Sequence, residues 1–378
     1  MMKIRTTLHI LLLVLCFSAL GTTECIAAKN GKGVVNIEQM LSKREVADLK
    51  ACISRHQNFV ITCHVSPDGD AIGSSTGLMH VLRALGKNAQ VVVPDVIRES
   101  LRFLPGVEDA IEYPKQVEEA QKAVDNADCI ICLDFNTLSR IGAFGPVVKA
   151  AKAEKVMIDH HLNPENFCDL TISYSDMSSA CELAYRSLLE IGLADKINRD
   201  AAECFYTGLM TDTGNFAYAS SDPNTFRVAA ELLEKGVDKD NVYQRAMNES
   251  SFKRLRLMGH ILQNNITIFP ESNGALMTVS KEDFERYGCN SDDAAGLANI
   301  PLQIPEVVWS IFLIEGGNGK VYVSARSRGD FPVNNICTKY FNGGGHANAA
   351  GGSVDGNIQD AIKVFNKVEA DVKAQKNK

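Results

Sequence analysis

Val156-Met157-Ile158-Asp159-His160-His161 joins a short apolar run to three residues that can bind protons or metals. Such an apolar run is typical of a buried strand. Two other apolar runs end in the same way, since Phe59–Thr62 leads to His64 and Ile130–Leu133 leads to Asp134. The carboxyl ends of parallel strands meet at one edge of a sheet, where ligands bind. We therefore expect these imidazoles and carboxylates to lie close together.

The pattern around this stretch predicts a parallel sheet. Apolar periodicity and turn residues predict strands over residues 59–63, 90–93, 129–133, 155–158 and 170–174, and helices over 37–56, 71–85, 115–125, 142–153, 178–191 and 199–210. Strands that alternate with helices of about ten or more residues are typical of parallel βαβ units. We therefore predict an α/β domain with a parallel sheet over residues 37–220.

The pattern changes after Ser220. Helical stretches predict a connector over residues 221–262. Beyond it, the sequence predicts strands over 266–269, 275–279, 307–314 and 320–325, and helices over 281–287 and 358–373. The glycine-rich stretch Glu315–Gly319 between two of these strands is typical of a hairpin. We predict a smaller α+β domain over residues 263–378.

Composition is that of an ordinary globular protein. The chain has 378 residues, 45% hydrophobic and 22% charged residues, and a net charge of −7. This length suits two domains. The acidic balance argues against a protein that coats long nucleic acid, which normally presents a basic surface. It leaves room for a nucleotide enzyme whose positive charge comes from metals and a few arginines.

Two features of the sequence give conflicting signals about the compartment. Residues 1–28 carry Lys3 and Arg5, then an apolar run and small residues, as a secretory signal peptide does. The eleven cysteines are an odd number and several lie in apolar segments, which does not resemble a disulfide scaffold. Cys129 and Cys132 face opposite sides of a predicted strand, so we interpret them as core residues.

The polar clusters have the composition of a site for two divalent ions. Two ions about 3.5–4 Å apart can activate a bound hydroxide for attack on phosphorus and stabilise the leaving oxygen. Asp134 is the best candidate to bridge the ions, because a carboxylate offers two oxygens. The other predicted ligands are His64 and Asp68 for one ion, and Asp70, His160 and Asp212 for the other. Oxygen-rich sites with imidazole suit Mn²⁺ or Mg²⁺, and zinc is the third alternative, although it more often recruits cysteine.

The remaining two residues of the triplet are the candidate catalytic residues. We expect Asp159 to orient His160 through the second ring nitrogen of that histidine. His161 then remains for the substrate, either as a hydrogen-bond donor to phosphate or as a general acid.

The second predicted domain offers two candidate substrate-binding stretches. Gly343-Gly344-Gly345-His346 is predicted to be a glycine loop whose backbone N–H groups can hold an anion. Ser324, Arg326 and Arg328 share one face of a predicted strand. An arginine there can bind phosphate through two hydrogen bonds or stack on a base.

The chain resembles the DHH phosphoesterases that carry a DHH-associated C-terminal domain, and most closely the bacterial nanoRNase/pAp-phosphatase branch. The motifs that carry the resemblance are, in chain order, His64–Ala71, Asp134, Asp159-His160-His161, the Asp212 loop, Ser324–Ser327 and Gly343–His346 with Ala350–Gly352. The resemblance covers residues 60–352. It implies a di-manganese catalytic domain, a flexible helical connector and a smaller domain that closes on the substrate. It also implies that the Gly343–His346 stretch and Arg326 hold the nucleotide and its terminal phosphate.

The same resemblance implies substrates of two to five nucleotides, the 3′-phosphate of pAp, or linear or cyclic dinucleotides. No stable complex with long nucleic acid is expected, and a homodimer is left open. Such substrates and the free cysteines favour the cytoplasm, whereas residues 1–28 favour export to the periplasm or beyond.

Three other functions compete with this hypothesis. A RecJ-like exonuclease would need a basic groove for a long single strand. A DHH-type pyrophosphatase would carry a different second domain, with a basic stretch in place of the Gly343–His346 motif. A non-catalytic nucleotide sensor would be expected to have lost metal ligands, yet every predicted ligand is present.

Overall fold

The computed structural model describes residues 37–248 and 250–376. The leader predicted over residues 1–28 lies outside them. From Gln39 onward the chain forms one compact unit. None of the helices in the described part of the chain combines the length and apolarity needed to cross a bilayer.

The first sheet confirms the predicted parallel α/β architecture. Its six strands have the order β3-β2-β1-β4-β5-β6, and all neighbours pair in parallel. They are β1 (Asn58–Thr62), β2 (Asn88–Val93), β3 (Ile111–Glu112), β4 (Cys129–Leu133), β5 (Glu154–Asp159) and β6 (Leu170–Ser173). The sequence did not predict β3, because two residues carry too little periodicity.

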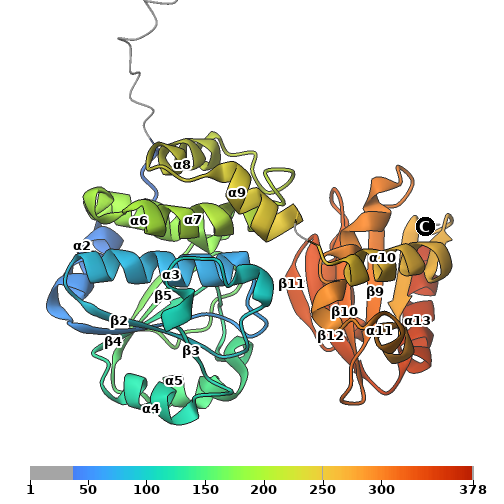
Figure 1. Ribbon diagram of the computed structural model, residues 1–378. Helices are drawn as coiled ribbons and strands as arrows, with labels where there is room; N and C mark the ends of the chain where they lie inside the picture. Colours follow the sequence, from blue (N-terminus) through green and yellow to red (C-terminus); the bar gives the residue numbers. More distant parts are fainter. Residues whose placement is uncertain (1–36, 249, 377–378) are drawn as a thin grey trace, which may run out of the picture. The chain divides into compact units, whose positions relative to one another are not determined.

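Helices cover both faces of this sheet (Figure 1). One face carries α3 (Gly69–Ala84), α6 (Ala180–Glu190) and α7 (Arg199–Asp212), and α8 (Pro223–Glu234) packs on α6 and α7. The other face carries α4 (Val117–Asp125) and α5 (Gly145–Ala150), while α2 (Lys43–Arg55) contacts the edge strand β6. Strands covered on both faces are buried along their length, as β4 is.

Two predicted helices begin or end differently. The helix predicted over 37–56 begins at Lys43, because the Ser42 side chain accepts a hydrogen bond from the Glu45 backbone N–H and forms a capping box. The helix predicted over 142–153 is replaced by a 3₁₀ segment (Leu138–Phe144) and the short α5. Gly142 has a φ of 51° and kinks the chain within the 3₁₀ segment, three residues before α5 begins.

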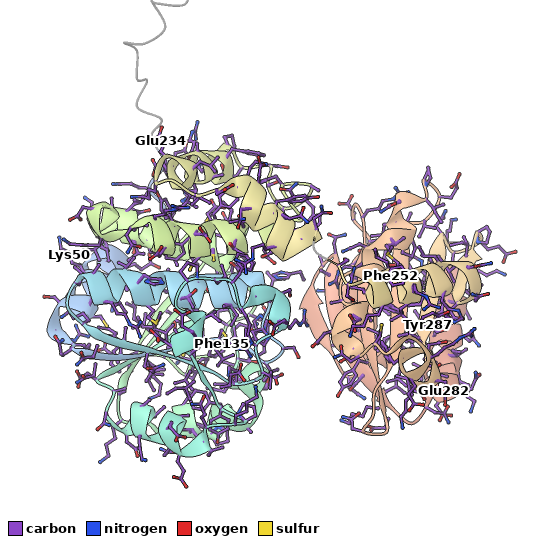
Figure 2. The ribbon with its side chains drawn as sticks, in the orientation of Figure 1. Lys50, Phe135, Glu234, Phe252, Glu282 and Tyr287 are labelled. Carbon is purple, nitrogen blue, oxygen red and sulfur yellow. The ribbon has the colours of Figure 1, made fainter. Side chains whose placement is uncertain are left out.

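The core under α4 and α5 supports the carboxyl edge of the first sheet. Phe135, labelled in Figure 2, is fully buried there and stacks on Phe167 with ring centroids 6.1 Å apart. Cys132 lies in the same core, whereas Cys129 contacts Cys52 on α2, with the two sulfurs 3.6 Å apart. Both cysteines of β4 are free and buried, which confirms their interpretation as core residues.

The second sheet is mixed. Its strands have the order β11-β12-β10-β9-β8-β7, and only β8 and β9 pair in parallel. They are β7 (Ile266–Phe269), β8 (Gly274–Val279), β9 (Trp309–Glu315), β10 (Lys320–Ser327), β11 (Gly344–His346) and β12 (Ala349–Asp355). The predicted hairpin joins β9 to β10.

Alternation along β9 builds one core on each face of this sheet. Trp309 packs with residues of α12 (Val333–Tyr340) and α13 (Ile358–Lys376), and Phe312 packs with residues of α10 (Phe252–Asn264) and α11 (Lys281–Tyr287). Along the chain, α7 is followed by α8, α9 (Lys239–Tyr243), a π-helical turn (Gln244–Asn248) and α10 before β7 begins. The domain limits at residues 220 and 262 stay predictions.

Short 3₁₀ segments complete the described chain at Glu99–Leu101, Val107–Asp109, Ala194–Lys196, Ser291–Ala294 and Leu297–Gln303. The sequence missed α12, β11 and β12. The expected glycine loop is wrong in its conformation, because Gly344–His346 is a strand paired with β12. Glycine-rich strands lack the β-branched side chains from which strands are predicted.

Candidate metal centre

The predicted metal ligands come together at the carboxyl edge of the first sheet. His64 lies just beyond β1, Asp134 just beyond β4, and His160 just beyond β5. Asp68 caps the N-terminus of α3, Asp70 lies in its first turn, and Asp212 is the last residue of α7. The two aspartates predicted to share a loop therefore lie at the start of a helix.

Asp134 lies between two groups of side chains. Its Oδ2 atom is 3.2 Å from His64 Nε2, and its Oδ1 atom is 3.4 Å from His160 Nε2. The residue has a φ of 62°, a left-handed conformation that is uncommon for a residue other than glycine. The buried neighbour Phe135 anchors the chain at this turn. Such strain is found where the surrounding structure holds a functional residue in place.

Each group has the ligand atoms that one metal ion needs. His64, Asp68 and Asp134 have ligand atoms within 4.8 Å of one another, and so do Asp70, His160 and Asp212. In the second group, His160 Nε2 is 3.8 Å from Asp70 Oδ2 and 3.5 Å from Asp212 Oδ2. This grouping is the one that the sequence predicted, with Asp134 between the two groups.

Glycines on α3 allow the approach of Asp70 and Asp212. Gly69, Gly73 and Gly77 recur every four residues and face α7. A Cβ atom at Gly73 would lie 2.4 Å from the Cys204 carbonyl oxygen, and one at Gly208 would lie 2.8 Å from Asp70 Oδ1. No larger residue fits without moving the helices apart. Close packing of α3 on α7 therefore sets the geometry of the second group.

The N-terminus of α6 holds Asp70. Its carboxylate accepts hydrogen bonds from the backbone N–H groups of Ala180, at 2.6 Å, and Cys181, at 2.9 Å. These are unpaired donors of the first helical turn, where the helix dipole also favours negative charge. The aspartate is therefore oriented before any cation binds.

Burial and neighbouring charges move the pKa values of this cluster in opposite directions. Burial alone would lower the pKa of His64, but Asp134 raises it to about 9. Burial and the nearby Asp134 raise the pKa of Asp70 to about 7. Burial would raise the pKa of Asp134, yet His160 and His64 hold it well below its usual range. Asp212 has its pKa raised by burial and then by Asp70.

These residues fit divalent metal ions. Four carboxylates and two imidazoles converge, and the ion-pair partners that the described residues supply to Asp134 are the imidazoles of His64, His160 and His161. Without a cation, the cluster is compensated by protonated imidazoles, which a metal would replace. Oxygen and imidazole donors suit Mn²⁺ or Mg²⁺.

Asp159 does not hold His160, contrary to the sequence prediction. It accepts hydrogen bonds from the His161 backbone N–H at 3.0 Å and from His161 Nδ1 at 2.8 Å. His160 Nδ1 instead faces the Met177 carbonyl oxygen at 3.2 Å, and His64 Nδ1 faces the Val65 carbonyl oxygen at 2.8 Å. Backbone carbonyls thus orient both predicted histidine ligands.

The sequence had no signal for these carbonyl partners, because any residue type supplies a backbone oxygen. Burial lowers the pKa of His161, although the hydrogen bond to Asp159 opposes that shift. In the close Asp159 contact, Nδ1 carries the proton, which leaves Nε2 as the ring atom that Asp159 does not engage.

His346 from the second sheet contacts the histidines of the first. Its ring stacks on His161 with centroids 4.5 Å apart and lies 5.1 Å from the His160 ring. Burial and then the two imidazoles lower the pKa of His346 to about 3. His346 is therefore neutral near pH 7, and it can donate only one ring hydrogen to a ligand.

The other predicted substrate residues line β10 and β11. Ser324 and Arg326 are half-buried positions that alternate with buried ones along β10, which confirms the predicted shared face. Arg328 lies beyond the strand, and its guanidinium hydrogen-bonds to the Pro305 carbonyl oxygen. Gly343 packs against β12, where a Cβ atom would lie 1.9 Å from the Gly351 carbonyl oxygen, and Gly344 and Gly345 lie in the edge strand β11.

A further cluster of Cys52, His56 and Glu154 lies at the opposite end of the first sheet. The Arg55 guanidinium pairs with both Glu154 oxygens there. This cluster is therefore neutralised by a cation of the chain itself.

Two family models match the chain. The first is described as the DHH family, N-terminal domain, and matches residues 58–209. The second is described as the DHHA1 domain and matches residues 274–371. The chain belongs to the DHH family. The first match covers the parallel sheet and every predicted metal ligand except Asp212, and the second covers most of the mixed sheet.

The relatives are similar over most of their length. This DHH protein is 34% identical over 296 residues to the bifunctional oligoribonuclease and PAP phosphatase NrnA of Thermus thermophilus. The aligned region covers 78% of this chain and 84% of that protein. It is 28% identical over 309 residues to the Bacillus subtilis protein of the same name, covering 81% of this chain and 92% of that protein.

A solved structure agrees with this relationship. The crystal structure of an exopolyphosphatase-related protein from Bacteroides fragilis is 40% identical, with a TM-score of 0.86. The match covers 90% of this chain and 100% of that chain. The similarity therefore includes both sheets of this DHH protein.

Proposed function

We propose that this DHH protein is a metal-dependent phosphoesterase that hydrolyses short oligoribonucleotides and the 3′-phosphate of pAp. The observation that carries the proposal is the position of Asp134, whose two oxygens face His64 and His160 in two separate ligand groups. The names of the two NrnA relatives supply the substrate class.

We propose two Mn²⁺ ions as the cofactors, held by His64 and Asp68 on one side and by Asp70, His160 and Asp212 on the other, with Asp134 shared. When bound, such ions activate water as a nucleophile and neutralise charge on the phosphate. Mg²⁺ is the alternative, since oxygen donors outnumber imidazoles.

Asp159 and His161 orient the catalytic imidazole and supply a proton to the leaving group in this proposal. The Asp159 carboxylate fixes the His161 ring through Nδ1, so Nε2 is left for the substrate. When both ring nitrogens are protonated, His161 can donate a proton to the leaving oxygen, and Asp159 stabilises that imidazolium.

Substrate binding falls to the second sheet in this proposal. Arg326 presents a guanidinium from β10, and burial lowers its pKa, an effect that Tyr218 opposes. This half-buried guanidinium donates to the Ala325 carbonyl oxygen at 2.9 Å and has further N–H donors for an incoming phosphate. Ser324, Gly343, Gly344, Gly345 and His346 would complete the nucleotide site.

The acidic charge of −7 argues against the RecJ-like alternative. The complete ligand set argues against a sensor that has lost catalysis. The expected partners are short nucleotides rather than long strands, and dimer formation stays a prediction. Cytoplasmic localisation also stays a prediction.

Product release from pAp, pApA and a five-nucleotide RNA tests this function. With Mn²⁺ we expect mononucleotides from pApA and the five-nucleotide RNA, and AMP plus inorganic phosphate from pAp. Turnover should be lost after EDTA treatment and recover when Mn²⁺ is restored. A five-nucleotide DNA and a long single strand serve as controls for substrate class. Turnover of the long strand alone would contradict the proposal, and so would no turnover of any short substrate by metal-loaded protein.

A further inference from the structure

A cavity of about 370 Å³ opens beside His161. It lies over the edge strand β6 and is bounded by the start of α2 and by the turn after the Asp-His-His triplet. None of the residues named above for metal or phosphate binding lines it, apart from His161. Its place next to His161 makes it a candidate for a second part of the substrate.

Hydroxyl and amide groups form the polar walls of the cavity. Thr171 and Ser173 are two residues apart on β6, so their side chains share one face of the sheet. Ser175 and Asn163 add an exposed hydroxyl and an exposed amide. Such groups donate and accept neutral hydrogen bonds, as needed for the ribose and base of a nucleoside.

Apart from His161, whose pKa is lowered by burial, Glu45 is the one ionisable residue in the lining, and its charge is negative. The Glu45 carboxylate is held by the Tyr174 hydroxyl at 2.9 Å and by the Ser42 backbone N–H at 2.8 Å. A fixed carboxylate repels phosphate and accepts hydrogen bonds from ribose hydroxyls or exocyclic amines. The charge of the cavity therefore favours a nucleoside and disfavours a phosphate group.

Two apolar residues form a surface on which a base can pack. Leu162 is 47% exposed and, with Pro164, follows the triplet directly. The turn is held in place because Asn136 Nδ2 donates to the Leu162 carbonyl oxygen at 2.6 Å, and the Glu165 N–H donates to the Asn136 carbonyl oxygen at 2.8 Å. The apolar surface of Leu162 and Pro164 is therefore anchored to the segment that begins with Asp134.

We propose that this cavity binds the nucleoside on the far side of the scissile phosphate, the part that pApA contains and pAp lacks. This assignment rests on the proposed function. In both substrates the bond from phosphorus to the 3′-oxygen breaks and a bond from phosphorus to the water oxygen forms. One water proton ends on the leaving 3′-oxygen. The two substrates then differ only in whether a nucleoside remains on the phosphate.

Two variants test the assignment, each with a matched control. Ser175→Trp fills the cavity, and Asp176→Trp places the same ring on the neighbouring exposed residue outside it. Asn163→Gly removes the amide at a residue with a φ of 59°, where glycine causes no strain. Asn166→Gly makes the same change at an exposed position three residues later, outside the cavity.

The measurement is kcat/KM for pApA and for pAp with the Mn²⁺-loaded full chain, together with the melting temperature of each variant. We expect Ser175→Trp to lower kcat/KM for pApA on the order of tenfold and to leave pAp within about twofold. Asn163→Gly should lower kcat/KM for pApA by about threefold and leave kcat/KM for pAp unchanged, because it removes one neutral hydrogen bond to the second nucleoside. Both controls should match the unmodified chain on both substrates.

Equal losses on pAp and pApA would overturn the assignment, as would unchanged turnover of pApA by the well-folded Ser175→Trp variant. The unmodified chain separates this failure from failure of the proposed function. If it hydrolyses both substrates, the function stands whatever the variants do. If it hydrolyses neither, the proposed function fails and the cavity assignment fails with it.

Discussion

The carboxyl edge of the first sheet and the β10–β12 face of the second sheet carry the two sets of predicted site residues, and they are built differently. At the first edge, His64, Asp134 and His160 follow buried strands directly. On the second sheet, Arg326 lies inside a strand, and the glycines of β11 lie in an edge strand. Residues at strand exits are placed by local chain direction, whereas residues within an antiparallel sheet depend on register with distant strands.

The chemistry of the two regions also differs. The first edge concentrates carboxylates and imidazoles that need cations, and the second presents a guanidinium, an imidazole and backbone groups that suit an anion. We therefore expect changes at the first edge to alter metal content and changes on the second sheet to alter substrate affinity.

Asp134→Ala should have the largest effect. It removes the carboxylate shared by both ligand groups, so turnover should fall by more than about 100-fold, since even outer partners of metal ligands cost 10–100-fold. Metal content per chain, measured by mass spectrometry, should fall at the same time. Asp176→Ala is the exposed control. Full activity in Asp134→Ala would show that the first edge does not hold the catalytic ions.

Metal affinity should depend strongly on pH. The pKa of His64 is raised to about 9 and that of Asp70 to about 7. Against the effect of burial, Asp134 also raises the pKa of His160 well above its usual range. A metal must displace all these protons, so affinity should rise as pH rises, by at least about 100-fold between pH 7 and pH 9, and fall more steeply below pH 7. Titration calorimetry in buffers of different ionisation enthalpy measures the protons released. Affinity independent of pH would contradict this account.

Asp159→Asn should separate catalysis from metal binding within the first edge. Because Asp159 holds His161 rather than His160, kcat should fall roughly 10–100-fold while metal content stays unchanged. The kcat of His161→Ala should fall to a similar level, and the kcat of the double variant should be little lower than that of either single variant. If metal content dropped instead, Asp159 would act on the ligands and the hydrogen bond to His161 would be incidental.

Arg326→Ala and His346→Ala should raise KM about tenfold through loss of a charge-assisted contact, with metal content unchanged. Arg326→Lys tests whether the fork geometry of the guanidinium matters, because lysine keeps the charge alone. Arg328→Ala is a matched control, since that guanidinium contacts the Pro305 carbonyl oxygen. Loss of metal in Arg326→Ala would remove the division between the two regions.

Gly208→Ala should show that helix packing sets the geometry of the first edge. Its Cβ atom would meet Cys181 Sγ at 2.2 Å, so we expect unfolding free energy to fall by about 1–3 kcal/mol. Gly259→Ala in α10 is the control, because no atom of the described residues lies within 4 Å of its added Cβ. That variant should gain about 0.5–1 kcal/mol. A melting temperature of Gly208→Ala equal to that of the unmodified chain would mean that α3 and α7 move apart without loss of stability.

The sequence by itself determined which residues meet at the first edge. Buried strands of a parallel sheet all end on one side, so His64, Asp134 and His160, which follow such strands, converge there. Asp70 and Asp212 join them through the packing of α3 on α7. The motif order also determined the family resemblance that the comparisons bear out. Even the glycines at positions 69, 73 and 77 carry a readable four-residue spacing.

Only the tertiary structure decided the finer roles. Asp159 binds His161, and the carbonyls of Val65 and Met177 orient the other two rings. The glycine stretch becomes a strand by pairing with β12. These arrangements depend on how the chain is packed in three dimensions. A hydrogen bond of this kind requires placement within about 3 Å. Spacing along a chain predicts which elements are neighbours, but the packing between those elements sets positions to that accuracy.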